Sequence, residues 1–233
     1  MPHYYAHRVF GNLVWNAFPD SIRQQVDGQE AGFQLGLYGP DPLFFYSLNQ
    51  RNPFVVTGHA QHNAPPGSVL ERYRGLLSQP QMAGYALGWL SHYLLDAVCH
   101  PTVLANCRGS VTHATLELAL DRRLIRQYPL PKEPHYDLDC LNAAAVSCPN
   151  LTGPGFGRAL KNFYYFSHTS ATLGHYGGRA DVTSLLEVRL RSSVDSCVHF
   201  SQLLLDALNG DTSLSFLPEL DFQGKRIAKP LPI

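Results

Sequence analysis

Apolar residues recur along most of this chain every three or four positions, a spacing typical of helices rather than strands. The strongest such segment, residues 82–99, is apolar on nearly every face, as expected for a central helix. Weaker periodic segments are separated by Gly and Pro. They span residues 12–26, 30–38, 69–77, 112–127, 138–146, 158–166 and 181–208. The pattern predicts a single all-α domain over residues 1–233.

Several boundaries can be predicted from the same pattern. Pro19 should kink or divide the helix over 12–26, because proline disrupts a helix interior. Residues 153–157 are rich in glycine and predict a loop. The segment 181–208 reads as one long helix, and residues after 211 as a tail that covers the surface. The inner face of that helix is predicted to carry Leu185, Val188, Ser192, Cys197 and Leu204.

Five polar residues interrupt the apolar segments at helical spacing. His92, Asp96 and His100 are four residues apart, and so are His113 and Glu117. Side chains at positions i and i+4 lie on one face of a helix. Charged groups on a buried face are costly unless they are paired or bind a metal. The pattern therefore predicts a metal site built from two helices.

Helix geometry divides this set of ligands. His92 and Asp96 are about 6 Å apart along the axis, whereas His92 and His100 are about 12 Å apart and differ by about 80° in direction. Zinc bonds to nitrogen or oxygen are about 2.0–2.2 Å long, so one ion can hardly join the two histidines. His100 is expected to serve a different ion, shared with His113 and Glu117. Pro101 disfavours helical backbone at His100, which would free this side chain to turn away. More than one metal ion is expected.

Composition excludes some functions. Lys+Arg and Asp+Glu both number 18, so the chain has no net positive charge to attract duplex nucleic acid. We see no signal peptide and no apolar run long enough for a transmembrane segment. Five cysteines without a CxxC pair are typical of reduced thiols, although Cys140 and Cys148 remain a possible disulfide. We expect a soluble, cytoplasmic protein, and the sequence indicates no oligomeric state.

Five stretches together carry a resemblance to a known family: PHYYAHRVFG, LGLYGPDPLFFY, GHAQHN, GWLSHYLLDAVCHP and VTHATLELALDRRL. Their order and spacing resemble the zinc-dependent phospholipase C family, an all-helical group that also includes single-strand-specific nucleases. The resemblance covers residues 1–127. It implies a multi-helix domain of phospholipase C type that holds two to three zinc ions in a cleft between packed helices.

The resemblance also implies a ligand set. Asp41, His62, His92 and Asp96 would hold one ion, His7 and a bridging Asp96 its neighbour, and His100, His113 and Glu117 the third. His59 is an alternative to His62. The spacing between glycine and histidine in similar sequences favours His62. Secreted relatives complete one site with an N-terminal Trp. Here the chain begins Met1-Pro2-His3. Either His3 or a trimmed N-terminus completes this site, or its ion is weakly bound or absent.

Further residues receive roles by their position. Paired zinc ions activate a bridging water and clamp phosphoryl oxygens, and Asp41, after Gly39-Pro40, is predicted as a ligand or as the general base. The aromatic residues that flank the ligands either pack in the core or line the substrate cleft. They are Tyr4, Tyr5, Phe44, Phe45 and Tyr46. Asp121 is expected to pair with Arg122 or Arg126, or to support a ligand histidine.

The predicted function is a zinc-dependent phosphoesterase that hydrolyses a P–O bond with metal-activated water. Its catalytic residues would be Asp41 and Asp96, and its substrate a phospholipid, a nucleotide or another small phosphoester. Two alternatives remain: a metal-dependent hydrolase or lyase for a non-phosphate metabolite, and a non-catalytic helical module stabilised by zinc. Structural zinc sites are usually rich in cysteine, so the ligand set of carboxylates and histidines favours catalysis.

Overall fold

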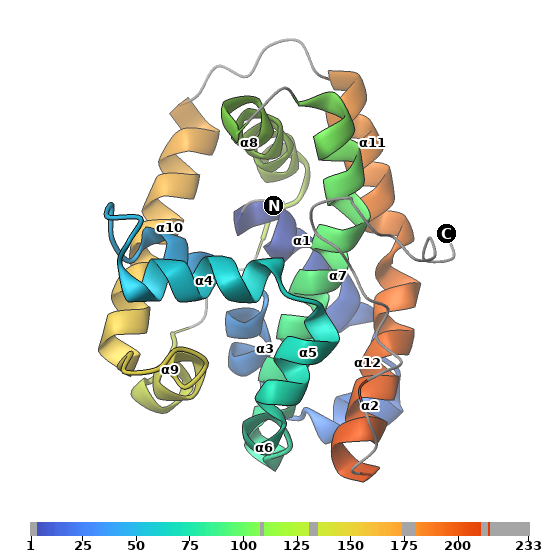
Figure 1. The fold of residues 1–233 in the computed structure, drawn as a ribbon. Coiled ribbons are helices and arrows are strands. Elements are labelled where there is room, and N and C mark those ends of the chain that lie inside the picture. The colour runs from blue at the N-terminus through green and yellow to red at the C-terminus, as the bar shows by residue number, and fades with distance from the viewer. Residues whose placement is uncertain (1–3, 108–109, 131–134, 174–179, 211–213, 215–233) are drawn as a thin grey trace.

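The computed structural model describes residues 4–107, 110–130, 135–173, 180–210 and 214 (Figure 1). Every regular element in these ranges is helical, which confirms the all-α prediction. The α-helices are α1 Tyr4–Ala17, α2 Asp20–Gln25, α3 Glu30–Gly36, α4 Pro53–Asn63, α5 Pro66–Arg72, α6 Arg74–Leu77, α7 Ala83–Asn106, α8 Ser110–Gln127, α9 Leu138–Ala145, α10 Gly153–Leu173, α11 Ala180–Ser192 and α12 Val194–Gly210. Two 3₁₀ helices complete the set, η1 Asp41–Phe45 and η2 Pro80–Met82.

Helix α7 lies at the centre of the bundle, where α1, α3, α8, α11 and α12 all pack against it (Figure 1). Its middle turns are buried on every side, including Trp89, Tyr93, Leu94 and Leu95. A helix that is apolar all round is stable only when other elements cover it completely. The polar residues of α7 therefore enter the interior together with the apolar ones.

The contact between α3 and α7 depends on two glycines. A Cβ atom at Gly88 would lie 2.1 Å from the carbonyl oxygen of Phe33, and one at Gly36 would lie 2.3 Å from that of Tyr85. Both obstacles are backbone atoms, so a rotamer change cannot remove them. The close approach brings the chain that follows α3 against α7. There Gly39 has a φ of 50°, and a Cβ atom at this position would lie 2.4 Å from the His92 ring.

Local capping explains two helices that the apolar pattern did not predict correctly. Residues 153–157 are not a loop, because α10 begins at Gly153, and the Thr152 hydroxyl accepts a hydrogen bond from the Gly155 amide. Helix α4 begins at Pro53, and the Asn52 side chain accepts from the Phe54 amide. A capping side chain followed by proline in the first turn is a known start signal for helices.

The expected end of the central helix was also wrong. Helix α7 does not stop before His100 but continues through Pro101 to Asn106. Proline inside a helix removes one backbone hydrogen bond and costs about 3 kcal/mol. The turn that follows buries Thr102 and Val103, and this burial offsets part of the cost. His100 therefore stays on the helix instead of turning away from it.

The segment 181–208 forms two helices, α11 and α12, with Ser193 between them. Cys197 and Leu204 are buried as predicted, but Leu185 and Val188 are 45% and 62% exposed. The buried face of α11 instead carries Val182, Leu186 and Leu190, four residues apart. The buried face of this helix was predicted incorrectly because apolar residues occur on two of its faces. The predicted tail lies outside the described residues, apart from the buried Leu214. Pro19, in contrast, divides the first predicted helix as expected.

We expect Gly88→Ala to lower the free energy of unfolding by about 1–3 kcal/mol or more, because its methyl group meets backbone that cannot move without separating α3 from α7. Gly75→Ala is the matched control, since a Cβ atom there has no neighbour within 4 Å. Urea denaturation measures both. A loss for Gly88→Ala no larger than that for Gly75→Ala would contradict the proposed close contact.

Candidate metal centre

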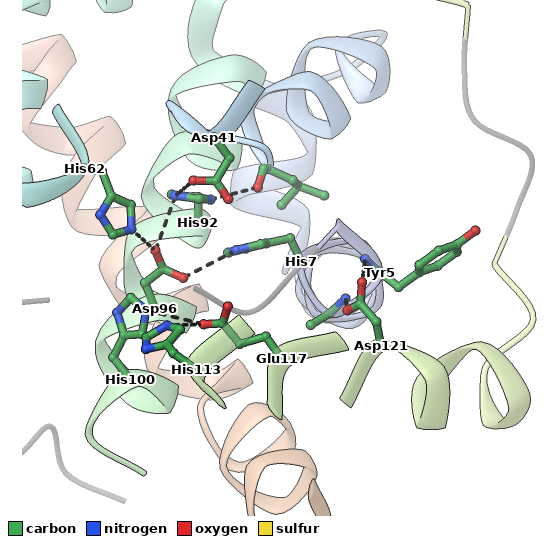
Figure 2. A network of polar contacts seen from close by, with 12 residues as sticks. Tyr5, His7, Asp41, His62, His92, Asp96, His100, His113, Glu117 and Asp121 are labelled. Atoms are coloured by element: carbon green, nitrogen blue, oxygen red, sulfur yellow. Dashed lines mark hydrogen bonds and ion pairs between the residues drawn. The ribbon is translucent and has the colours of Figure 1, made fainter. Parts of the chain in front are cut away.

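Five elements bring the predicted ligands to one place (Figure 2). Helix α7 carries three of them, α8 carries two, and α1, α4 and the start of η1 each contribute one. The eight residues are His7, Asp41, His62, His92, Asp96, His100, His113 and Glu117. All of them are buried except His113, whose side chain is 24% exposed.

Asp96 is the centre of the cluster (Figure 2). Its Oδ1 lies 3.4 Å from His7 Nε2, and its Oδ2 lies 3.2 Å from His62 Nε2 and 3.5 Å from His92 Nε2. One fully buried carboxylate thus faces imidazoles from three different helices. Such an arrangement allows the two oxygens to bind different ions, with Asp96 as the bridge between them.

A second carboxylate organises the other end of the cluster. Glu117 Oε1 lies 2.7 Å from His113 Nε2 and 3.7 Å from His100 Nε2. The His100 ring also lies edge-on to that of His62, with 5.8 Å between the ring centroids. His100 therefore joins the Glu117 end of the cluster to the Asp96 end.

The ligand atoms form three overlapping groups, in each of which the atoms lie within 4.8 Å of one another. The groups are His7, His92 and Asp96; His62, Asp96 and His100; and His100, His113 and Glu117. Asp96 and His100 each belong to two groups. No group contains both His92 and His100, in agreement with their expected separation of about 12 Å along the helix axis. Shared ligands of this kind indicate adjacent sites rather than separate ones.

The grouping differs from the one that the family resemblance implies. The structure pairs His7 with His92, and the two rings stack with centroids 4.3 Å apart. Asp41 lies beside the three groups rather than within them, with Oδ1 3.8 Å from His92 Nε2. Of the two alternatives on α4, His62 lies in the cluster, whereas His59 is exposed. His3 lies outside the described residues.

The ring of His92 is fixed in one tautomer by its surroundings. Its Nδ1 lies 3.1 Å from the backbone carbonyl of Leu37. A carbonyl oxygen only accepts, so Nδ1 carries the hydrogen, and Nε2 presents its lone pair to the cluster. Burial, and secondly the neighbouring His7, hold the pKa of His92 well below its usual value. A neutral His92 thus offers Nε2 as a candidate metal ligand, and a backbone group orients its ring as is usual for metal-binding histidines.

Several polar atoms of the cluster are buried without a hydrogen-bond partner among the residues that the structure describes. They are both ring nitrogens of His7, both carboxylate oxygens of Asp41, Nε2 of His92 and Oδ1 of Asp96. An unsatisfied buried polar atom costs about 1–3 kcal/mol. Six such atoms in four neighbouring residues are far more than a folded chain leaves unpaired by accident. Metal ions bound by these atoms would satisfy them.

The two carboxylates near His92 differ in their electrostatics. Burial raises the pKa of Asp41 well above its usual value, and the negative charge of Asp96 raises it further. Burial would also raise the pKa of Asp96, but His92, His62 and His7 together hold it well below its usual value. These opposite shifts favour negative charge on Asp96, and a second negative charge at Asp41 would require positive charge nearby.

Asp121 has a structural role that the sequence did not predict. Its two carboxylate oxygens accept hydrogen bonds from the backbone amides of Tyr5 and Ala6, at 3.0 and 2.9 Å (Figure 2). It thus caps the N-terminal turn of α1, where the first amides have no partner within the helix. The expected pairing with Arg122 or Arg126, or with a ligand histidine, stays a prediction. Through the two amides Asp121 fixes α1 and, with it, the position of His7.

Hydrogen bonds also fix α4 beside α7. The Tyr93 hydroxyl donates to the backbone carbonyl of Gln61 at 3.0 Å. The Gln61 side-chain amide donates to the carbonyl of Ser147, as does the hydroxyl of Tyr73. Because Gln61 precedes His62, these bonds set the distance of the His62 ring from Asp96.

The flanking aromatic residues divide between the core and the edge of the cluster. Tyr4 is completely buried and stacks on Tyr38, so it belongs to the core. Phe44 is partly exposed, stacks on His59 and meets His62 edge-on. Phe45 packs on the aromatic residues of α10, and Tyr46 contacts Phe54. Phe44 thus contacts a predicted ligand, His62. All five cysteines are free, including Cys140 and Cys148.

Comparison with known proteins agrees with this geometry. The family model for zinc-dependent phospholipase C matches residues 6–152, so the chain belongs to the zinc-dependent phospholipase C family. This confirms the resemblance seen in the sequence. No curated protein and no solved structure matches the chain significantly. None of the helices in the described ranges combines the length and hydropathy needed to cross a membrane.

Zinc, which the family implies, fits the residues present. Bonds of about 2.0–2.1 Å in tetrahedral geometry place two ligand atoms about 3.4 Å from each other. Nitrogen and oxygen atoms around Asp96 and His92 are 3.2–3.8 Å apart. Most of these separations are too long for a good hydrogen bond but suit two ligands of one ion. The cluster as a whole offers imidazole nitrogen and carboxylate oxygen, which are zinc ligands.

We expect zinc chelation to lower the melting temperature of the purified chain by about 10 °C, because a metal held only by the folded state stabilises it by about 4 kcal/mol at a thousandfold excess over Kd. Asp96→Asn should remove most of this shift and reduce the zinc content measured by elemental analysis. Asp206→Asn, at an exposed carboxylate on α12, is the control. The same chelation shift in Asp96→Asn and wild type would contradict the assigned centre.

Proposed function

We propose that this chain is a phosphoesterase that hydrolyses a P–O bond with water activated by two or three zinc ions. The single observation that supports the proposal best is the set of overlapping ligand groups that share Asp96 and His100. A shared carboxylate is what adjacent catalytic ions require, whereas a structural zinc site is closed and separate. The membership in a zinc-dependent phospholipase C family supports the same conclusion.

The ligand residues have distinct tasks in this proposal. His7, His92 and Asp96 would hold one ion, and His62 and Asp96 a second. His100 would complete either this second site or a third with His113 and Glu117, because a neutral imidazole has one lone pair to donate. When bound, zinc supplies a water of lowered pKa and stabilises negative charge on phosphate oxygens. Burial lowers the pKa of His92, His100 and His113, which favours the neutral rings that zinc binds.

Asp41 is the residue best placed to accept a proton from the attacking water. Its carboxylate lies next to His92 but outside the three ligand groups, and neither oxygen has a hydrogen-bond partner among the described residues. It is completely buried at the start of η1, where Gly39 allows the chain to pass close to the His92 ring. We assign it the role of accepting a proton from the attacking water, in preference to direct ligation.

The charge of the centre favours an anionic substrate. The cluster holds three carboxylates, those of Asp41, Asp96 and Glu117, against two or three divalent ions. The balance is therefore positive, and a phosphate ester would neutralise it in a site that excludes most water. Phe44, partly exposed beside His62 and His59, would contact the group attached to the phosphate. A phospholipid headgroup and a small soluble phosphoester both satisfy this chemistry.

A substrate panel on wild type and Asp41→Asn tests the proposal. We expect wild type to hydrolyse at least one of p-nitrophenyl phosphorylcholine, a phosphatidylcholine or a single-stranded oligonucleotide in the presence of zinc. Asp41→Asn should keep its zinc and lose activity by about 10²–10⁴-fold, the usual contribution of a general base.

Two results would revise the proposal in different ways. Loss of zinc from Asp41→Asn would make Asp41 a ligand rather than the base. A wild-type protein that binds two or more zinc ions and hydrolyses no phosphoester would contradict the phosphoesterase assignment, and would favour a different metal-dependent reaction or a structural role for the ions.

A further inference from the structure

One side of the molecule is formed by two segments without acidic residues. No Asp or Glu occurs between Asp41 and Glu71, or between Asp139 and Asp181, although the chain as a whole has equal numbers of acidic and basic residues. These segments contain η1, α4 and α10, and η1 packs against both helices.

The cations of this side lack carboxylate partners. Arg51, Arg158 and Lys161 are exposed, and none of them forms an ion pair with an acidic residue among those the structure describes. Arg158 and Lys161 lie over aromatic rings instead, those of Tyr46 and Tyr165. Their positive charge is therefore available to an external anion.

Exposed apolar side chains lie among these cations. Leu48 is fully exposed, and Tyr165 and Phe166 on α10 are 55% and 48% exposed. The loop that carries Leu48 has internal hydrogen bonds, from the Asn49 amide to the Ser47 hydroxyl and from the Arg51 amide to the Asn49 side chain. These bonds give the loop a defined shape in which Leu48 projects away from the protein.

Contacts between η1 and α10 join these residues into one surface. The Phe45 ring packs on that of Phe166, the Asn162 side chain donates to the carbonyl of Phe45, and Arg158 donates to the hydroxyl of Tyr46. We call Leu48, Arg51, Arg158, Lys161, Tyr165 and Phe166 the docking surface. It combines exposed aromatic and aliphatic groups with unpaired cations.

The docking surface lies close to the candidate metal centre. Helix η1 begins at Asp41, beside His92, and ends at Phe45, which contacts the docking surface. A 3₁₀ helix rises about 2.0 Å per residue, so these two residues are about 8 Å apart along the axis. Phe44, between them, borders both His62 and the exposed His59.

We infer that the docking surface binds an anionic phospholipid bilayer. Tyrosine and other aromatic rings are favoured at the level of the lipid headgroups, and each nearby Lys or Arg adds attraction to anionic lipid. Leu48 would enter the acyl region, and the three cations would meet phosphate and carboxylate groups. The purpose of docking rests on the proposed function, since it would bring the metal centre to phosphoesters in the membrane.

Cosedimentation with vesicles tests the inference without depending on catalysis. We expect the full chain to bind vesicles of phosphatidylcholine with about a third phosphatidylserine, and to bind pure phosphatidylcholine vesicles more weakly. Raised salt should weaken binding to the anionic vesicles. Leu48→Ser should reduce the partition coefficient by about tenfold, and Lys161→Gln by about fivefold.

Matched controls and a soluble substrate separate the possible outcomes. Val188→Ser, at an exposed apolar residue on α11, and Arg126→Gln, at an exposed cation on α8, should bind as wild type does. Leu48→Ser should hydrolyse a water-soluble phosphoester at the wild-type rate but a vesicle substrate more slowly. Binding without any hydrolysis would count against the proposed function and leave the docking surface supported.

Two results would overturn the inference. The first is equal vesicle binding by wild type, Leu48→Ser and Lys161→Gln. The second is no vesicle binding by wild type at all. If the chain instead forms a dimer in sedimentation experiments that Leu48→Ser disrupts, the surface binds a second copy rather than a membrane.

Discussion

The burial of Asp96 among imidazoles is the constraint on which the rest of the site depends. A carboxylate on the central helix can be completely buried only if positive charge or strong donors surround it. His7, His62 and His92 approach it from three helices, yet in the described part of the chain Oδ1 of Asp96 and Nε2 of His92 have no hydrogen-bond partner. Metal ions between these groups would resolve the mismatch, and the folded state and the proposed metal centre would then depend on each other.

The bundle holds this cluster in place with contacts that lie outside it. The glycines of α3 and α7 allow two backbones to touch, which brings the Leu37 carbonyl to His92 and the turn at Gly39 against its ring. Asp121 caps α1 and so positions His7, and Tyr93 fixes α4 through Gln61. Ligand geometry is thus set by helix packing and backbone hydrogen bonds rather than by the ligands themselves.

Much of this could be predicted from the sequence, because helical periodicity and i, i+4 spacing are local properties. The spacing of His92, Asp96 and His100 indicated more than one site, and the structure places His92 and His100 in different ligand groups. That the whole chain forms one domain, and that these residues bind zinc, stay predictions. What the sequence could not show depends on contacts distant along the chain: the pairing of His7 with His92, and the cap that Asp121 gives to α1. The continuation of α7 through Pro101 was missed for a related reason, since tertiary burial can outweigh a local preference.

An anomalous scattering experiment at the zinc absorption edge, on crystals of the purified chain, tests the central claim most directly. We expect at least two strong peaks in the anomalous difference map, one next to Asp96 Oδ1 and one next to Oδ2, so that this carboxylate bridges two ions. A further peak beside His100, His113 and Glu117 would complete the centre. A map without a peak within bonding distance of Asp96 would contradict the account.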